Sequence, residues 1–199
     1  MSHPAASRRG RRPGAPDTRA AILAAARELF AAQGFAGTTV RSVAASAGVD
    51  AALVHHYFGT KDDLFVAALE LTLDPREAIA PVLAGGIDGA GERVMRLFFS
   101  VWDVEETRLP LLALVRGIVE PGGAQLVRDG FLRMVLAPIG AALEIDQPER
   151  RLPLVASQLA GLVMLRYVVA VEPLASTPAD ELVAIYGPTL QRYLSGPLP

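Results

Sequence analysis

The sequence contains no cysteine, and among its 19 lysines and arginines the only lysine is Lys61. Without cysteine the chain offers no disulfide framework, no thiolate metal site and no thiol nucleophile, which suits a reducing cytosol. No histidine follows His56, so a histidine-held metal site in the rest of the chain is unsupported. We therefore predict no metal site and no cofactor.

Long hydrophobic runs are also missing. Arg166 interrupts the best stretch, "GLVMLRYVVAV", and a membrane-spanning helix needs about 18 or more apolar residues in sequence. The N-terminal residues "MSHPAASRRGRRPGAPDT" carry arginines without an apolar core behind them, so they do not look like an export signal. We expect a cytoplasmic protein with no membrane partner.

The alternation of period two that marks strands is absent, and proline and glycine divide the chain into helix-length segments. These features predict an all-α fold. The expected helices span 18–33, 40–47, 51–58, 61–73, a short segment from 75, 90–106, 110–119, 123–144, 149–172 and 178–194, the last kinked at Pro188. The expected domains are a flexible basic arm over 1–16, a helix-turn-helix domain over 17–64, and a larger helical domain over 65–199.

Two short helices joined through Gly48 make the helix-turn-helix candidate. On a helical wheel of 51–58, Val54 and Phe58 share one side, and the small or ring-bearing residues Ala52, Leu53 and His56 lie broadly opposite. Small residues let a helix approach the floor of a major groove, where other side chains reach base edges. An ordinary surface helix is the alternative for any one of these features taken alone.

The segment "TTVRSVAASAGVDAALVHHYFGTKDDLF" resembles the DNA-binding segment of the tetracycline-repressor (TetR) family. The family pattern of T-x-x-x-I-A-x-x-A-G-V, an aromatic pair and K-x-x-L falls on Thr39, Val43, Ala44, Ala47, Gly48, Val49, Tyr57, Phe58, Lys61 and Leu64. The resemblance covers 18–73, and beyond that it is architectural only. It implies a homodimeric transcriptional regulator, expected to be a repressor, that binds a palindromic double-stranded DNA operator.

The resemblance also implies roles for individual residues. Thr39 would present its hydroxyl and a helix N-terminus to a phosphate, Arg41 would reach a base or the backbone, and Tyr57 and Lys61 would each bind a phosphate. The expected lining of the groove is Ala51, Ala52, Leu53, His55 and His56. A lysine ammonium suits a single phosphate oxygen, whereas the planar fork of arginine matches a bidentate partner. His55 departs from the tyrosine that many members carry, which shortens the reach to a phosphate.

The N-terminal arm carries "RRGRRPG", close to the R-G-R-P core of minor-groove hooks. Arginine is favoured in narrow minor grooves, so Arg9, Arg11 and Arg12 are candidate DNA contacts. The alternative is a solvated tail that only aids solubility.

The segment 149–172 is apolar nearly all round, so it has to be covered on every side. It is either a central helix of a monomer or part of a subunit interface. The resemblance implies that the last two long helices pair with their copies in a four-helix bundle. The predicted interface residues are Val155, Leu159, Leu162, Val163, Leu182, Ile185 and Leu190.

The stretch "RVMRLFFSVWDVEE" places several methionine and aromatic side chains on one helix, and such residues line adaptable apolar pockets. The cluster is either a plain core or, as the resemblance implies, the lining of a cavity for an apolar or amphipathic small-molecule effector. The predicted lining is Met95, Phe98, Phe99, Trp102, Leu111, Leu114, Met134 and Val135, with Arg116 as a polar anchor. A constitutive regulator and an all-α enzyme are the alternative functions, although carboxylates such as Glu105 and Glu106 are too scattered to form a catalytic site.

Overall fold

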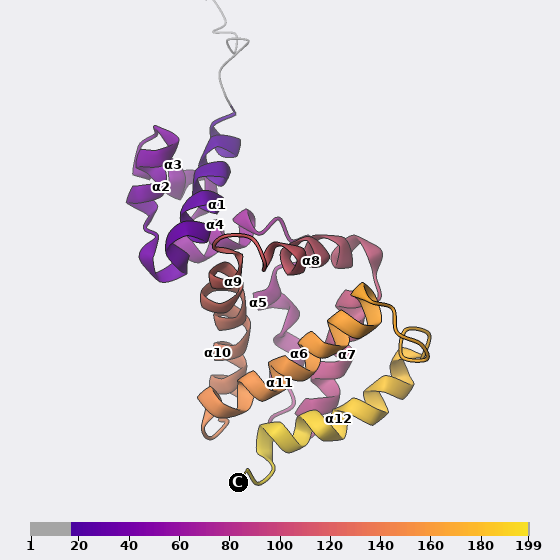
Figure 1. Ribbon diagram of the computed structural model, residues 1–199. Helices are drawn as coiled ribbons and strands as arrows, with labels where there is room; N and C mark the ends of the chain where they lie inside the picture. The colour runs from indigo at the N-terminus through magenta and orange to yellow at the C-terminus, as the bar shows by residue number, and fades with distance from the viewer. Residues whose placement is uncertain (1–16, 199) are drawn as a thin grey trace, which may run out of the picture.

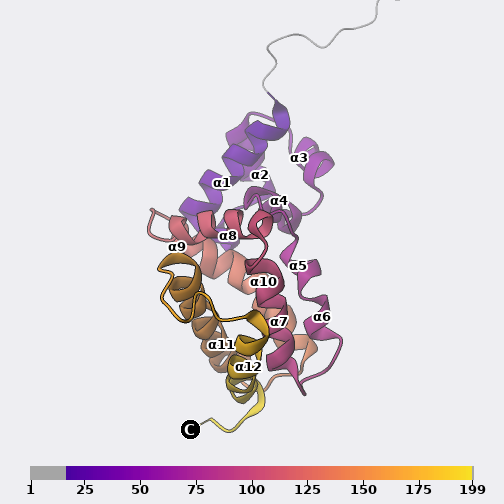
Figure 2. The ribbon, with the colours of Figure 1, turned by 90° about the vertical axis from the view of Figure 1, so that its right-hand side faces the viewer.

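The computed structural model describes residues 17–198, and every regular element within that range is helical. The all-α prediction is therefore confirmed. Figure 1 shows a small N-terminal unit, α1–α4, at one end of the molecule and a larger C-terminal unit, α5–α12, beyond it. The C-terminus lies at the end opposite the N-terminal unit in both views (Figures 1 and 2). In this described part of the chain no helix is long and apolar enough to cross a bilayer.

The N-terminal unit consists of α1 (Thr18–Gly37), α2 (Val40–Ala47), α3 (Ala51–Phe58) and α4 (Lys61–Ala68). Three phenylalanine rings lie at its centre. Phe65 meets Phe30 edge-on at 5.0 Å and Phe35 edge-on at 5.2 Å between ring centroids. Phe65 and Ala68, which follow the predicted domain boundary at residue 64, are both buried in this core. The α4 helix also ends at Ala68, short of the predicted position 73.

The ends of these helices are fixed by local hydrogen bonds, as the sequence predicts. Asp50 accepts from the backbone N–H of Ala52 at 2.7 Å, and capping boxes start α2 at Thr39 and α4 at Thr60. Gly48 ends α2 in the left-handed region at φ 67°, a conformation that glycine adopts without a steric penalty. The turn between α2 and α3 therefore follows directly from the sequence.

The C-terminal unit contains shorter and less regular helices than predicted. Its elements are α5 (Pro75–Ala78), α6 (Ala80–Leu83), α7 (Ala90–Trp102), α8 (Glu105–Gly117), α9 (Gly123–Leu126), the π-helix η1 (Val127–Leu132), α10 (Arg133–Ala142), α11 (Pro148–Leu162), the π-helix η2 (Val163–Val168) and α12 (Ala179–Ser195). The predicted helices over 123–144 and 149–172 thus each contain a π-helical segment. The α12 helix continues through Pro188.

The α8 helix begins at Glu105, ahead of the predicted start at 110. Pro110 lies inside it and has no N–H to donate to the carbonyl of Glu106 one turn back. That carbonyl accepts a hydrogen bond from the Thr72 hydroxyl at 3.2 Å instead. The vacant acceptor is therefore used by a residue distant in sequence, which explains how the helix includes the proline.

The core of the C-terminal unit forms where α7 packs along α12 and α11 packs beside α12. A Cβ added to Gly91 of α7 would lie 2.3 Å from the carbonyl oxygen of Gly187 of α12. Only glycine allows the two backbones to approach this closely. Gln191 joins the same helices, because its side chain accepts from Gly91 N–H at 3.0 Å and donates to the Ile87 carbonyl at 2.9 Å.

Candidate nucleic-acid interface

The α3 helix presents the face that the helical wheel predicts. Val54 and Phe58 are buried in the N-terminal core, and the residues that point to solvent are Ala52, His55, His56 and Tyr57. Ala51 and Leu53 are half-buried, so Leu53 reaches solvent less fully than the wheel indicates. The outward face of α3 thus combines small side chains with three rings.

His55 is fixed at the C-terminal end of α3. Its Nδ1 lies 2.8 Å from the carbonyl oxygen of Gly59, so the tautomer that suits this contact carries its proton on Nδ1 and donates it to the carbonyl. In the neutral ring Nε2 is then an acceptor. A phosphate contact through Nε2 would require the protonated ring, which carries a second donor.

His56 and Tyr57 lie together on the solvent side of the helix. Their ring centroids are 5.6 Å apart at an interplanar angle of 67°. Tyr57 is 44 % exposed, while its neighbour Phe58 is buried. The phenol can therefore extend away from the protein while its ring is supported from one side.

The N-terminus of α2 lies open to solvent beside this face. The hydroxyl of Thr39 accepts from Ser42 N–H at 3.0 Å, and Thr39 N–H donates to the Ser42 hydroxyl at 3.0 Å. Thr39 and Arg41 are both exposed. A helix N-terminus of this kind favours a negatively charged group through its dipole and its unpaired N–H groups.

Lys61, the first residue of α4, lies against an aromatic ring. Its Nζ is 4.3 Å from the centroid of Phe35, at the end of α1, which is within the range of a cation–π contact. This contact holds the ammonium group close to the start of α4. Sequence reasoning missed it because Phe35 and Lys61 belong to different helices and no local pattern connects them.

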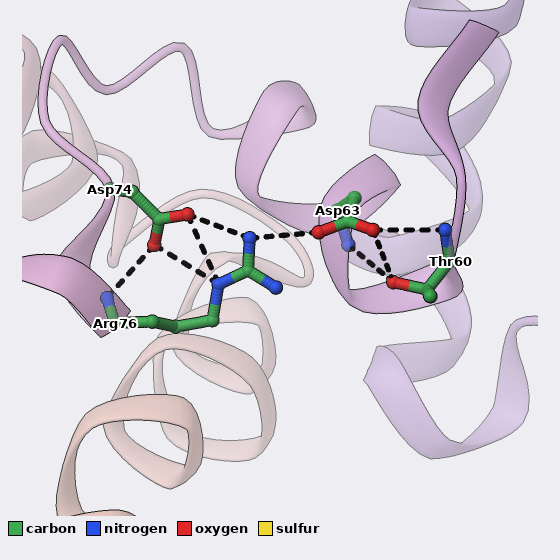
Figure 3. Close-up of polar contacts among 4 residues, drawn as sticks. All are labelled: Thr60, Asp63, Asp74 and Arg76. Carbon is green, nitrogen blue, oxygen red and sulfur yellow. Dashed lines mark hydrogen bonds and ion pairs between the residues drawn. The ribbon is translucent and has the colours of Figure 1, made fainter.

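An ionic network joins α4 to the C-terminal unit (Figure 3). The guanidinium of Arg76, on α5, contacts Asp63 of α4 at 2.8 Å and Asp74, the N-cap of α5, at 2.6 Å. Asp63 also accepts from the hydroxyl of Thr60 at 2.6 Å and from its backbone N–H at 3.0 Å. Thr60, the N-cap that precedes Lys61, is therefore connected to α5 through the carboxylate of Asp63.

The charges in this network favour the ionised carboxylates. Hydrogen bonds from Thr60 and then from Arg76 lower the pKa of Asp63 to about 2. The hydrogen bonds and charge of Arg76 also lower the pKa of Asp74, and the two acids together raise the pKa of Arg76. Both carboxylates therefore stay charged at any pH near neutrality.

The residues predicted for the effector pocket are divided between two cores. Met95, Phe98 and Phe99 are buried in the C-terminal core, with Trp102 and Val135 packed against it. Met134 packs instead against the N-terminal core. It lies at the start of α10, directly after η1, and both η1 and α9 contact α1. Leu111 is buried and Leu114 half-buried, but Arg116 is exposed at the end of α8. Arg116 therefore does not point into a cluster with the aromatic residues.

A hollow of about 820 Å³ lies elsewhere, between α10 and α11. Its apolar wall includes Leu132, Leu136 and Leu152, and Glu144 and Glu149 lie at its edge. It shares no residue with the predicted pocket. In the part of the chain that the structure describes, no group of three His, Asp or Glu side chains could hold a metal ion.

Most residues predicted for the dimer interface are buried within the chain itself. Ile185 is 56 % exposed and Leu159 is half-buried. The buried ones are Val155, Leu162, Val163, Leu182 and Leu190. They pack in the core with α7, so a second copy cannot reach them. Helical periodicity showed apolar faces on both helices but did not indicate which face turns inward.

The surface of these helices that a second copy can reach is the opposite one, here called the outer face. It exposes apolar and small side chains on α11, η2 and α12: Leu154, Ser157, Gly161, Met164, Leu165, Val168, Ala184, Ile185 and Pro188. The predicted DNA contacts Arg9, Arg11 and Arg12 lie outside the described residues.

Comparison with known families accounts for both units. Residues 22–68 match the family described as bacterial regulatory proteins, tetR family. Residues 88–194, more than half of the chain, match the tetracyclin repressor-like C-terminal domain. The chain belongs to the TetR family. It is accordingly a DNA-binding transcriptional regulator, and proteins of this kind are generally not enzymes.

The chain is also similar to individual proteins. An HTH-type transcriptional repressor of Mycobacterium tuberculosis is 36% identical over 128 residues, which are 60% of this chain and 68% of the relative. A TetR-family regulator of Streptomyces coelicolor A3 with a solved structure is 42% identical, covering 93% of this chain and 98% of that one at a TM-score of 0.46. The multidrug binding protein EbrR, solved with ethidium, is 22% identical, covering 89% of this chain and 98% of that one at a TM-score of 0.45.

Proposed function

We propose that the protein is a homodimeric repressor that binds a roughly palindromic operator and releases it when a small apolar or amphipathic molecule binds the C-terminal unit. The observation that carries the DNA part is the solvent-facing surface of α3. Its small residues and exposed rings belong to the same unit as two capped helix N-termini, those of α2 and α4. This arrangement suits a helix inserted in a major groove and held by phosphates on both sides.

Each residue predicted to contact DNA then has a defined role. Ala51 and Ala52 allow close approach to the groove, and Leu53, His55 and His56 face the base edges. Phosphate contacts come from Thr39, Tyr57 and Lys61, and Arg41 reaches either a base or the backbone. Arg9, Arg11 and Arg12 enter the neighbouring minor groove, where arginine is favoured.

The outer face is the surface that we assign to the second copy. A soluble protein rarely exposes a continuous apolar stripe unless something binds it. Gly161 and Ala184 are small and exposed on adjacent helices, so a partner's helices can approach closely there. Pairing through this face would produce a four-helix bundle from α11 and α12 of each copy.

The symmetry of the operator tests this proposal. Two α3 helices in successive major grooves require half-sites about 34 to 36 Å apart. Selection from a random DNA library should return inverted repeats with that spacing. Selected sites without two-fold symmetry would contradict the dimeric arrangement, and failure to bind any DNA would contradict the function itself.

The effector part has its own test. Trp102 is the only tryptophan in the chain and stacks on Phe98 at 5.8 Å, so it reports on this cluster. An effector that binds there should change Trp102 emission over the concentrations that release the operator, and DNA should weaken its binding by the same factor. If no compound in a broad screen releases the operator, the protein is a constitutive regulator.

A further inference from the structure

A second ring cluster lies where the C-terminal end of α7 meets η2. Trp102 stacks on Phe98, and Tyr167 lies 5.4 Å from Trp102 and 6.2 Å from Phe98 between ring centroids. Trp102 and Tyr167 are only half-buried, so the cluster extends from the core to the surface. The Tyr167 hydroxyl donates to Asp103 at 2.7 Å, and burial together with this bond raises the pKa of Tyr167.

Arg166 brings a positive charge into the same cluster. Its side chain is 10% exposed, and its guanidinium lies 5.4 Å from the centroid of Phe99 and 5.5 Å from that of Tyr167. One terminal nitrogen donates to the carbonyls of Leu174 and Thr177, at 2.7 and 2.8 Å. Among the described residues, nothing accepts a hydrogen bond from its buried Nε–H.

Arg151, on α11, shows how unusual that donor is. It is also buried, and its Nε donates to the Asp146 carbonyl at 3.1 Å, while a terminal nitrogen donates to the carbonyls of Tyr193 and Gly196. A buried donor without an acceptor destabilises the folded state. The unused N–H of Arg166 is therefore a position where an acceptor would bind favourably.

We propose that Arg166 Nε binds the carbonyl-type oxygen of an uncharged aromatic molecule, whose ring stacks with Trp102 and Tyr167. This inference rests on the proposed effector function and names the chemical class of the effector. A guanidinium can only donate, so the ligand has to supply an acceptor. The carboxylate of Asp103 already lies 3.6 Å from Arg166 Nη2, so a second negative charge would be repelled and a neutral oxygen is favoured.

In this proposal Arg166 is the polar anchor of the pocket, the role that was predicted from the sequence for Arg116. Arg166 belongs to η2, a π-helix, and single π-helical turns occur frequently at functional sites. Because Nε is closed off from solvent, the ligand binds the arrangement in which Trp102 and Tyr167 have moved apart. η2 also carries Leu165 and Val168 of the outer face, so a change at Arg166 is transmitted directly to the surface assigned to the second copy.

The test compares two probes that differ in one oxygen, 1-tetralone and the hydrocarbon tetralin. Affinities for the full chain without DNA are measured by calorimetry and by Trp102 emission. We expect 1-tetralone to bind about tenfold or more tightly than tetralin, because a hydrogen bond to a charged group is made by only one of them. Equal affinities, or binding of neither probe, would overturn the proposal.

Two substitutions identify the donor. Arg166→Lys keeps a cation for the Leu174 and Thr177 carbonyls but removes the Nε–H, and it should reduce the preference for 1-tetralone to about one. Arg151→Lys makes the same change at the other buried arginine and should leave the preference intact. If the preference for 1-tetralone survives Arg166→Lys, the ligand binds elsewhere. The same conclusion follows if Leu136→Glu, in the hollow between α10 and α11, abolishes the preference.

Arginine labelled with ¹⁵N at Nε gives an additional measurement if Arg166→Lys does not fold. One protected Nε–H signal of the unsubstituted chain should move with 1-tetralone and stay in place with tetralin. No such movement would reject the proposal. Operator binding without any probe is measured separately, so loss of DNA binding would reject the proposed function, whereas equal probe affinities reject only this inference.

Discussion

The two units of this protein are built in different ways. In the N-terminal unit, three phenylalanine rings are enclosed by four helices whose ends are fixed by their own caps. In the C-terminal unit, prolines lie inside α8, α10, α11 and α12, two segments are π-helical, and apolar side chains such as Leu165 and Ile185 remain exposed.

This difference suits two different functions, presentation of α3 to DNA by the N-terminal unit and binding of the proposed partners by the C-terminal unit. The helices of the N-terminal unit are capped by their own residues, and its core is closed by Leu126 and Met134 of the C-terminal unit, so we expect it to present α3 to DNA as a rigid body. The C-terminal unit keeps an exposed apolar face and an unused buried donor at Arg166, the two features to which we assign the proposed second copy and the proposed ligand. The proposed second copy follows from the exposed apolar face, and the proposed ligand follows from the Arg166 Nε–H that has no acceptor.

The largest effect is expected from removing the central ring of the N-terminal core. Phe65→Ala should destabilise this unit by about 3 to 5 kcal/mol, because a fully buried phenylalanine leaves a cavity. Ile185→Ala, at an exposed site, should change the stability of the single chain by less than about 0.5 kcal/mol. Amide hydrogen exchange would locate the change in α1–α4. Equal loss of protection in α11 and α12 would show that the units are not separate.

A smaller loss is expected where α7 meets α12. Gly91→Ala should destabilise the C-terminal unit by about 1 to 3 kcal/mol, because the new methyl group collides with the Gly187 carbonyl. Gly117→Ala is the matched control, since a Cβ there meets nothing within 4 Å. Urea denaturation measures both variants. Similar stability of the two would contradict the close helix contact.

The ionic link between the units predicts a dependence on acid. The pKa of Asp63 is lowered from 3.8 to about 2, so its contribution to stability is present above about pH 4 and lost as the pH falls towards 2. Its side chain is 38% exposed, and screening by solvent limits the contribution to at most about 1 kcal/mol. Asp63→Asn should remove this part of the pH dependence in urea denaturation. An unchanged pH profile would mean that the Asp63 carboxylate, with its hydrogen bonds from Thr60 and then from Arg76, does not stabilise the folded state.

The smallest effect concerns Lys61. Lys61→Ala should reduce the dependence of log affinity on log salt by about one per subunit without changing sequence preference, because one phosphate contact is lost. Lys61→Arg retains the charge and should keep the slope. An unaltered slope in Lys61→Ala would mean that Lys61 does not contact a phosphate. Deleting residues 1–16 should lower the slope further if Arg9, Arg11 and Arg12 contact DNA.

The parts of the structure that could be predicted from sequence are those specified by neighbouring residues. Thr39, Asp50 and Thr60 each cap a helix through bonds to residues two or three positions away, so α2, α3 and the start of α4 were located correctly. The buried positions of Val54 and Phe58 followed from the period of a single helix.

The remainder depends on contacts between distant segments. The sequence gives no local sign that Arg76 meets Asp63, that Lys61 lies on Phe35, or that Met134 joins the N-terminal core. Nor does periodicity decide which face of an almost wholly apolar helix is buried. For that reason the sequence indicates that these helices are apolar, while most of the residues predicted for the interface lie buried within the chain.

The proposed dimer can be tested by adding one charge to the outer face. Leu165→Asp is placed at an exposed site of η2, and Val119→Asp, two residues past the end of α8 and 87% exposed, is the control. Sedimentation velocity and operator affinity are measured together with helix content. The account predicts a folded monomeric Leu165→Asp whose affinity for the whole operator falls to that for a half-site, because avidity is lost, and a dimeric Val119→Asp. A Leu165→Asp protein that remains dimeric and binds the operator at full affinity would contradict it.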